Sequence, residues 1–263
     1  MIDIRTVTAT RYVAPLREGG SLPGLMEADD LGTYVVKFRG AAQGVRTLIA
    51  ELITGEIGRL LDLPVPEIVF VELDPVFARA EPDPDIQDLL AASAGLNLAL
   101  DFLPGSLAYS AAMQKLVDPD LAARIVWFDA LTTNIDRTPR NPNLLIWHRK
   151  LWLIDHGASL YLQHSWTDLE SRARTPFPQI ADHVLLPVAS SIIAAGTSCL
   201  PKITPDAITA IISALPDDWL SECAPFATPA DLRQAYLDLI LTRLSVADAF
   251  EAEAELARGR IAL

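Results

Sequence analysis

The sequence predicts an α+β protein with a mixed strand-and-helix part over residues 1–103 and a mainly helical part over residues 104–263. In the first part, runs rich in β-branched and aromatic residues, bounded by glycine and proline, surround one helical pattern. After the turn sequence Leu103-Pro-Gly-Ser106, apolar residues recur mainly with helical spacing. We therefore expect two units of unequal size that share a cleft.

The first part is predicted to contain four strands and one helix. The strands are expected at residues 8–15, 33–38, 68–73 and 98–103. A break containing Gly19, Gly20, Ser21 and Gly24 separates the first two strands, and the acidic, proline-containing segment 81–88 separates the last two. Apolar positions at helical spacing over residues 44–61 predict an amphipathic helix that ends before Leu63-Pro-Val-Pro66.

The second part is predicted to be helical apart from one hairpin. Helices are expected at residues 121–133, 180–195, 205–215 and 229–262. Two short apolar runs, residues 144–147 and 151–154, flank His148-Arg-Lys150 and predict a β-hairpin. This hairpin would bring the residues that follow it back beside the residues that precede it.

The composition argues against several classes of protein. The chain has 263 residues, of which 51% are hydrophobic, and a formal net charge of −13. Such a charge repels nucleic acid and anionic membranes, so general nucleic-acid binding is not expected. Cys199 and Cys223 suggest neither a disulfide framework nor a zinc site, which favours a reducing cytoplasm. We expect no export signal, because the N-terminus lacks a basic start followed by an apolar core and a cleavage site. We expect no membrane span, because no uninterrupted apolar run reaches about 18 residues.

Residues 134–157 contain the clearest chemical pattern. They read Asn-Ile-Asp-Arg-Thr-Pro-Arg-Asn-Pro-Asn, then two apolar runs, then Leu-Ile-Asp-His-Gly. A protein-kinase-type centre uses one Asp for the acceptor hydroxyl and an Asn/Asp pair for magnesium. We therefore predict that Asp136 orients or deprotonates the acceptor, and that Asn141 and Asp155 bind Mg²⁺ through oxygen atoms.

Four neighbours of these residues are expected in supporting roles. Arg137 or Arg140 would offset the charge of a phosphate. Asn134 and Asn143 would order the loop through local hydrogen bonds to the backbone rather than bind the metal.

A phosphate-binding group is predicted in the first part of the chain. Lys37 stands in a Tyr-Val-Val-Lys-Phe strand, where its ammonium could bind phosphate, and Glu51 on the following helix could pair with it. Backbone N–H groups of Gly19, Gly20 and Ser21 could approach phosphate oxygens without obstruction from Cβ atoms. Taken singly, a strand lysine or a Gly-Gly-Ser turn is more often a surface feature. The order of all these elements along one chain favours the functional interpretation.

Five segments, in this order, carry a resemblance to a known family: Gly19-Gly-Ser-Leu-Pro, Tyr34-Val-Val-Lys-Phe, Ala50-Glu51 with Leu61-Asp-Leu-Pro-Val-Pro-Glu67, Asn134-Ile-Asp-Arg-Thr-Pro-Arg-Asn141 and Leu153-Ile-Asp-His-Gly157. Together they resemble the HipA-like kinases over about residues 8–160. The Asp-Arg…Asn…Asp-His-Gly part is also similar to phosphatidylinositol kinases. Asn134-Ile-Asp and Asp155-His-Gly replace the His-Arg-Asp and Asp-Phe-Gly of ordinary protein kinases.

The resemblance implies a two-lobed kinase fold with ATP and magnesium in the cleft. Lys37 would bind the nucleotide phosphates, Asp136 would be catalytic, and Asn141 and Asp155 would bind the metal. It also implies that Asp101, Phe102 and Leu103 line the adenine side of the hinge between the lobes. No toxin role follows from it, because the chain is short for a full HipA toxin.

The acceptor is not determined by these residues. Serine or threonine of a protein substrate is the leading expectation, and a small molecule or a lipid headgroup is the alternative. A pseudokinase that serves as a nucleotide-binding interaction module is the rival from another class. The oligomeric state is left open.

Overall fold

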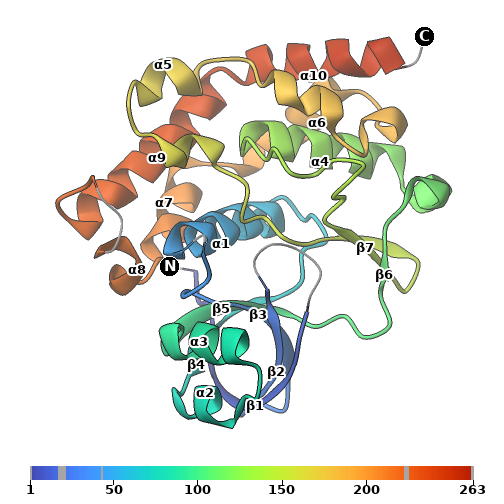
Figure 1. The fold of residues 1–263 in the computed structure, drawn as a ribbon. Coiled ribbons are helices and arrows are strands. Elements are labelled where there is room, and N and C mark those ends of the chain that lie inside the picture. Colours follow the sequence, from blue (N-terminus) through green and yellow to red (C-terminus); the bar gives the residue numbers. More distant parts are fainter. Residues whose placement is uncertain (1, 17–21, 43, 222–224, 262–263) are drawn as a thin grey trace.

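The N-terminal strands close into a barrel. The computed structural model describes residues 2–16, 22–42, 44–221 and 225–261 (Figure 1). The barrel runs in the order β1-β2-β3-β5-β4, and its neighbours are antiparallel except β1 and β4, which are parallel. The five strands are β1 (Thr6–Pro15), β2 (Gly24–Ala28), β3 (Thr33–Lys37), β4 (Ile68–Leu73) and β5 (Gly95–Asp101).

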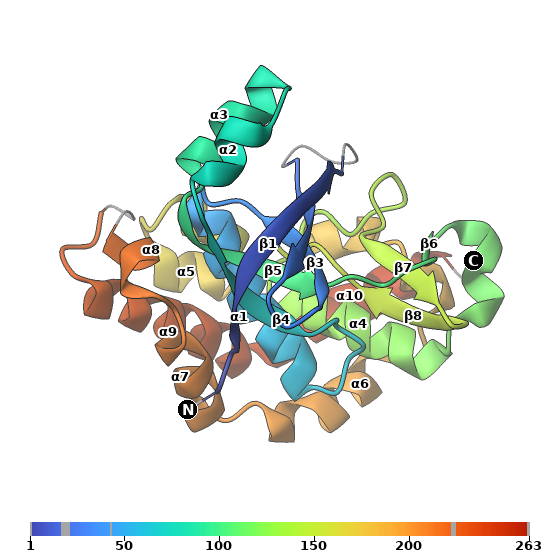
Figure 2. The same ribbon diagram turned by 90° about the horizontal axis from the view of Figure 1, so that it is seen from below.

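The barrel is filled by the alternate apolar residues of its strands. Val36 and Val69 are fully buried there, together with Met26 at 1% exposure. Two short helices, α2 (Val76–Ala80) and α3 (Pro84–Ala92), extend this apolar cluster through residues that include Leu90. Figure 2 shows the two helices projecting at one end of the barrel. The barrel is thus a packed core of its own.

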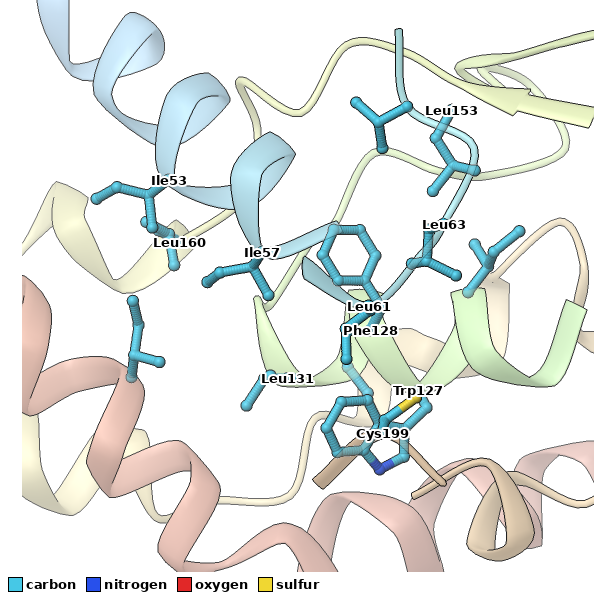
Figure 3. Close-up of a cluster of buried hydrophobic side chains, with 14 of the residues drawn as sticks. Ile53, Ile57, Leu61, Leu63, Trp127, Phe128, Leu131, Leu153, Leu160 and Cys199 are labelled. Carbon is cyan, nitrogen blue, oxygen red and sulfur yellow. The ribbon is translucent and has the colours of Figure 1, made fainter. Parts of the chain in front are cut away.

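Helix α1 (Val45–Leu60) lies between the barrel and the helical part of the chain. Of its 16 residues, 12 are buried. Figure 3 shows Ile57 of α1 near Phe128 and Leu131 of α4 (Pro119–Leu131), and Ile53 beside Leu160. One continuous apolar cluster includes the α1 residues, Phe70 of β4 and the helices that follow. A helix that is buried on nearly every side is an interior element, not a surface helix.

The rest of the chain is helical apart from a small sheet. The sheet pairs β6 (Leu107–Ala108), β7 (Leu144–Trp147) and β8 (Lys150–Leu153), all antiparallel. Its hairpin turns through His148 and Arg149, which have φ values of 48° and 64°, the left-handed geometry that a two-residue turn requires. The remaining helices are α5 (Leu169–Ala173), α6 (Ile192–Cys199), α7 (Pro205–Ser213), α8 (Asp217–Ser221), α9 (Pro229–Ser245) and α10 (Ala247–Ile261). The short 3₁₀ helices are η1 (Ala111–Leu116), η2 (Tyr161–His164), η3 (Pro178–Asp182), η4 (Leu186–Val188) and η5 (Leu200–Lys202).

Several predicted elements agree closely with the structure. The strand at residues 68–73 has the predicted bounds, and the helices and hairpin strands near residues 45–60, 119–131 and 144–153 agree within about two residues. These segments combine strong periodicity with clear stop signals, which is where sequence patterns are most informative.

The prediction of two strands at residues 8–15 and 33–38 was incomplete. The structure adds β2 between them, so this stretch of the chain contains three strands. Gly24, expected as part of the glycine break, is the first residue of β2 and pairs with Pro15 and Val36. A strand of five residues that begins at glycine has too little periodicity to be recognised in the sequence.

Two other segments of this part differ from the prediction. The acidic segment 81–88 contains the start of α3, where Asp83 caps the helix by accepting a hydrogen bond from Asp85 N at 3.1 Å. The last barrel strand lies at Gly95–Asp101, about three residues earlier than expected.

Two predicted helices are each divided. Residues 180–195 contain two 3₁₀ turns before α6, whose cap Ser191 accepts from Ala194 N at 3.3 Å. Residues 229–262 form α9 and α10, which meet at Val246 without a glycine or proline. Helix α10 leaves the direction of α9 and packs against α4 and α6, so tertiary packing decides this break.

Within the described residues, no helix has both the length and the apolar character needed to cross a bilayer.

Gly24 offers a test of the barrel packing. A Cβ atom there would lie 2.7 Å from Phe38 Cζ and 2.8 Å from Tyr12 Cε2. We expect Gly24→Ala to lower the free energy of unfolding by about 1–3 kcal/mol through overpacking. Gly259→Ala in α10 is the matched control, because nothing lies near its Cβ position, and it should be neutral or stabilising by up to about 1 kcal/mol. Urea denaturation measures both, and equal stability of the two variants would contradict the packing assigned to Gly24.

Candidate active site

Three charged side chains from distant segments meet at the end of the barrel. Lys37 Nζ, at the end of β3, lies 2.5 Å from Glu51 Oε2 on α1. The same Nζ atom also contacts Asp155 Oδ1, which follows β8. The side chains of Lys37 and Glu51 are 7% and 0% exposed, whereas that of Asp155 is 39% exposed. The predicted pairing of Lys37 with Glu51 is therefore present, and Asp155 is its third member.

The electrostatics of this group keep the lysine charged. Burial alone would lower the pKa of Lys37, but the carboxylates of Glu51 and Asp155 outweigh burial and raise it. The nearby ammonium lowers the pKa of Asp155, whereas burial raises the pKa of Glu51 despite the same ammonium. Lys37 and Asp155 thus form an ion pair in which the lysine is buried and the carboxylate of Asp155 is partly accessible to solvent.

Close approach of α1 fixes the backbone after Asp155. Asp155 has φ 56°, a left-handed conformation that Asp adopts more readily than most residues. At Gly157 a Cβ atom would collide with Thr47 Cγ2 of α1 and would lie 3.6 Å from Glu51 Oε2. A side chain at position 157 would therefore obstruct the approach of α1 that brings Glu51 to Lys37.

A second group of side chains surrounds Asp136 in the loop after α4. Asp136 Oδ2 accepts hydrogen bonds from Asn141 Nδ2 at 2.7 Å and Asn143 Nδ2 at 3.3 Å. Asn134 Oδ1 accepts from Asp136 N at 3.1 Å, so this residue orders the loop as expected. Within the described chain, Asp136 Oδ1 and the amide oxygen of Asn141 accept no hydrogen bond. Both oxygens are thus left for a ligand.

A buried arginine joins the two groups. Arg137 donates from Nη1 to Asn143 O at 2.5 Å and to Ile154 O at 3.4 Å, and from Nη2 to His156 Nδ1 at 3.2 Å. Ile154 N also donates to Asn143 O at 3.1 Å. The loop of Asp136 and the segment of Asp155 are therefore held side by side by the same guanidinium.

Arg137 is itself held by Asp129 of α4. Arg137 Nε lies 2.6 Å from Asp129 Oδ2, and both side chains are fully buried. His183 Nε2 donates to the same oxygen at 2.8 Å, because His183 Nδ1 accepts from Leu185 N. Asn134 Nδ2 donates to Asp129 Oδ1 at 3.1 Å. Both oxygens of this buried carboxylate thus accept hydrogen bonds, from Arg137 and Asn134 of the active-site loop and from His183.

The pKa values of this network follow from its contacts. Burial would raise the pKa of Asp129, but Arg137 and the His183 hydrogen bond lower it to about 2. Burial lowers the pKa of His183 despite Asp129, and burial with Arg137 nearby lowers the pKa of His156 to about 3. The network therefore contains charged Asp129 and Arg137 with neutral imidazoles at neutral pH.

This network was not expected from the sequence. Arg137 was one of two arginines predicted to offset phosphate charge, and this is wrong for Arg137 because its guanidinium is buried on Asp129. Arg140 is exposed. The one available signal was Asp129 itself, a carboxylate in the apolar run Trp127-Phe-Asp-Ala-Leu, which requires a buried partner.

The structure brings some predicted site residues together and leaves others apart. Lys37, Glu51 and Asp155 form one group, and Asp136 and Asn141 form the other. Gly19, Gly20 and Ser21 lie outside the described residues. The described residues contain no group of three or more His, Cys, Asp or Glu side chains able to hold a metal. A metal at Asn141 and Asp155 would therefore need further oxygen ligands from a bound molecule.

The predicted hinge follows β5 directly. Asp101 N donates to Glu67 O at 2.9 Å, and Phe102 N donates to Thr33 O at 3.0 Å. Phe102 is half-buried and Leu103 is buried. Of the three residues, Leu103 is the one whose N–H makes no hydrogen bond to the described chain.

A closed five-stranded barrel, one buried helix and a helical remainder with a lysine–glutamate–aspartate group define a kinase-like fold. The model of the HipA-like kinase family matches residues 10–253, and the chain belongs to this family. The match extends well past residue 165, beyond the motifs recognisable in the sequence. A comparison with curated proteins gave no match.

Two solved structures share the fold. The proinflammatory kinase CtkA of Helicobacter pylori is similar with a TM-score of 0.60 and 14% identity, over 96% of this chain and 98% of that one. The Golgi casein kinase with Mn and ADP bound is similar with a TM-score of 0.50 and 13% identity, over 95% of this chain and 73% of that one. The chain is therefore a kinase by family and by fold.

Removal of the Asp129 charge should be strongly destabilising. Asp129→Asn leaves the buried Arg137 guanidinium without its counter-ion, so we expect the free energy of unfolding to fall by about 3–5 kcal/mol. Asp182→Asn, at an exposed position, is the control and should change it by less than about 0.5 kcal/mol. Urea denaturation measures both. A loss below about 1 kcal/mol for Asp129→Asn would show that the network does not support the fold.

His183 should make stability depend on pH. Burial lowers the pKa of this imidazole in the native state, so the unfolded chain, in which its pKa is about 6.5, binds more protons than the native state as the pH falls. The free energy of unfolding should therefore fall as the pH is lowered from 7 to 5, and less steeply in His183→Gln. The two proteins differ only at position 183, so the difference between the two slopes isolates His183. Identical slopes would contradict a neutral, buried His183.

Proposed function

We propose that this kinase uses ATP and magnesium to phosphorylate serine or threonine of a protein substrate. The observation that carries the proposal is the meeting of Lys37, Glu51 and Asp155 from three separate segments, beside a loop that presents Asp136 and Asn141. Phosphoryl transfer needs a cation for the phosphates, oxygen ligands for a metal and a group for the acceptor hydroxyl. The site offers a candidate for each requirement: Lys37 as the cation, Asn141 and Asp155 as the metal ligands, and Asp136 for the acceptor hydroxyl.

Lys37 is proposed to bind the phosphates next to the transferred group. Its raised pKa keeps the ammonium charged, and Glu51 holds the ammonium in place from the buried side. Gly19, Gly20 and Ser21 are proposed to add backbone N–H groups on the same phosphates.

Asn141 and Asp155 are proposed as the magnesium ligands. A carboxamide oxygen and one carboxylate, completed by phosphate oxygens and water, are a suitable donor set for Mg²⁺. The exposed carboxylate of Asp155 and the uncommitted amide oxygen of Asn141 support this assignment. Bound magnesium would neutralise charge that develops on the phosphate oxygens.

Asp136 is proposed to receive the proton of the acceptor hydroxyl. Asn141 and Asn143 both donate to Oδ2, which orients the carboxylate and leaves Oδ1 for the acceptor. A positioned carboxylate of this kind contributes by orientation as much as by basicity.

Asp101, Phe102 and Leu103 are proposed to line the adenine side of the site. The Leu103 amide is the backbone donor that supports this placement, because those of Asp101 and Phe102 are already bonded. Residues 1–103 and 104–263 would then be the two lobes on either side of the nucleotide. A related fold that carries Mn and ADP in the Golgi casein kinase supports the choice of nucleotide and divalent metal.

A protein acceptor is favoured over a small molecule by the name of that neighbour, which is a casein kinase. The buried, unpaired thiol of Cys199 is compatible with the proposed reducing cytoplasm.

Three variants test the proposal. Asp136→Asn should still bind ATP with magnesium, because Asp136 is not proposed to contact the nucleotide, but phosphate transfer should fall by about 10²–10⁴-fold. Lys37→Met and Asp155→Asn should also lower the increase in melting temperature that ATP and magnesium produce. Asp182→Asn is the control and should match the wild type in both measurements.

Labelled ATP and thermal unfolding provide the two measurements. Transfer that persists unchanged in Asp136→Asn would rule out its role, and binding without transfer in the wild type would favour a pseudokinase. Phosphoproteomics of cells that carry the wild-type protein or Asp136→Asn would identify the acceptor, and labelled lipid or small-molecule products instead would favour the alternative acceptors.

A further inference from the structure

Helix α1 is covered over most of its surface: 12 of its 16 residues are buried, and only Arg59 is exposed. Besides the barrel and α4, helices α7 and α8 lie against it, and Figures 1 and 2 both show α7 and α8 beside α1. Residues buried in α1 include Glu51 as well as its neighbours Ala50 and Leu52. In protein kinases the lysine–glutamate pair must be in place for activity, and the position of the glutamate helix controls it. Here α7 and α8 of the C-terminal part pack against the helix that carries the glutamate.

Trp219 of α8 connects these two helices to the barrel. It is fully buried in α8 and donates from Nε1 to Leu96 O of β5 at 3.1 Å. Its ring also meets Phe70 of β4 edge to face, with 5.6 Å between centroids. One tryptophan thus joins two barrel strands to a helix that contacts α1.

The helices that carry Trp219 are themselves anchored. Ile208 and Ile211 of α7 are fully buried in the cluster that contains the α1 residues. Arg233 of α9 donates to Leu215 O at 2.5 Å and lies 2.7 Å from Asp217, so it holds the turn between α7 and α8. Helices α7 and α8 are therefore bound both to the rest of the helical part and to the barrel.

We propose that α7 and α8 hold α1 permanently in the position where Glu51 contacts Lys37, with Trp219 as a positioning residue for that pair. Movement of α1 away from Lys37 would open a cavity in a continuous apolar core, which is costly because such interiors are close-packed. The pair is therefore formed before any ligand binds, and no separate activating partner is needed to move α1. The inference deepens the proposed function, on which its kinetic consequence rests.

Trp127 provides a matched control. Like Trp219 it is fully buried, donates from Nε1 to one acceptor, Glu251 Oε1 at 2.7 Å, and meets a phenylalanine, Phe250, edge to face. It belongs to α4, however, and makes these contacts with α10. Replacement of either tryptophan by alanine should destabilise the protein, but only Trp219 should act through α1.

Hydrogen exchange of the full chain without nucleotide is the primary test. In Trp219→Ala, amides of α1 should exchange at least tenfold faster relative to amides of α4 than they do in the wild type. In Trp127→Ala this ratio should stay the same or fall. Trp219→Phe keeps an aromatic ring against Phe70 and should restore the ratio to within threefold of the wild type. An unchanged ratio in Trp219→Ala would overturn the proposal.

Phosphate transfer is the second measurement, made at a temperature where urea curves show each variant to be folded. We expect kcat to fall at least tenfold in Trp219→Ala and less than threefold in Trp219→Phe and Trp127→Ala. Wild-type kcat in folded Trp219→Ala would also overturn the proposal. A wild-type protein without transfer would instead refute the proposed function, and the exchange ratio would still decide whether α7 and α8 hold α1.

Discussion

The rest of the site depends on the burial of one ammonium between two carboxylates. Lys37 cannot be buried without Glu51 and Asp155, and those partners come from α1 and from the residues after β8. An unpaired charge at this depth would be strongly unfavourable, so the ion pair requires the barrel, α1 and the hairpin to assemble together. Gly157 permits the close approach of α1 that this assembly needs.

A second buried ion pair, between Arg137 and Asp129, supports the loop of the site. Arg137 and Asp129 pair in the interior, and the remaining donors of the guanidinium reach the backbone of Asn143 and Ile154. The loop of Asp136 therefore takes its shape from a charge pair that cannot itself touch a substrate. Rigid support of this kind is what a positioned carboxylate needs to orient an acceptor.

The C-terminal helices serve the site although they carry no recognisable motif. Arg243 of α9 is buried with no carboxylate partner among the described residues, and burial lowers its pKa to about 10. Its donors reach Ala130 O at 2.7 Å at the end of α4 and Ala173 O at 3.0 Å at the end of α5, where helix dipoles favour a cation. Together with Trp219 of α8, it ties the C-terminal part to the start of the active-site loop and to the barrel.

The sequence by itself determined the local features: strongly periodic helices, the hairpin, the residues of the loop, and the presence of Lys37 and Glu51 on successive elements. These follow from side-chain periodicity and turn chemistry, which act within a few residues. Only the tertiary structure decided that Asp155 meets Lys37, that Arg137 faces Asp129 rather than a phosphate, and that the helix predicted over residues 229–262 divides at Val246. Those outcomes depend on which charges lose water together and which apolar faces meet, and neither can be read from spacing along one chain.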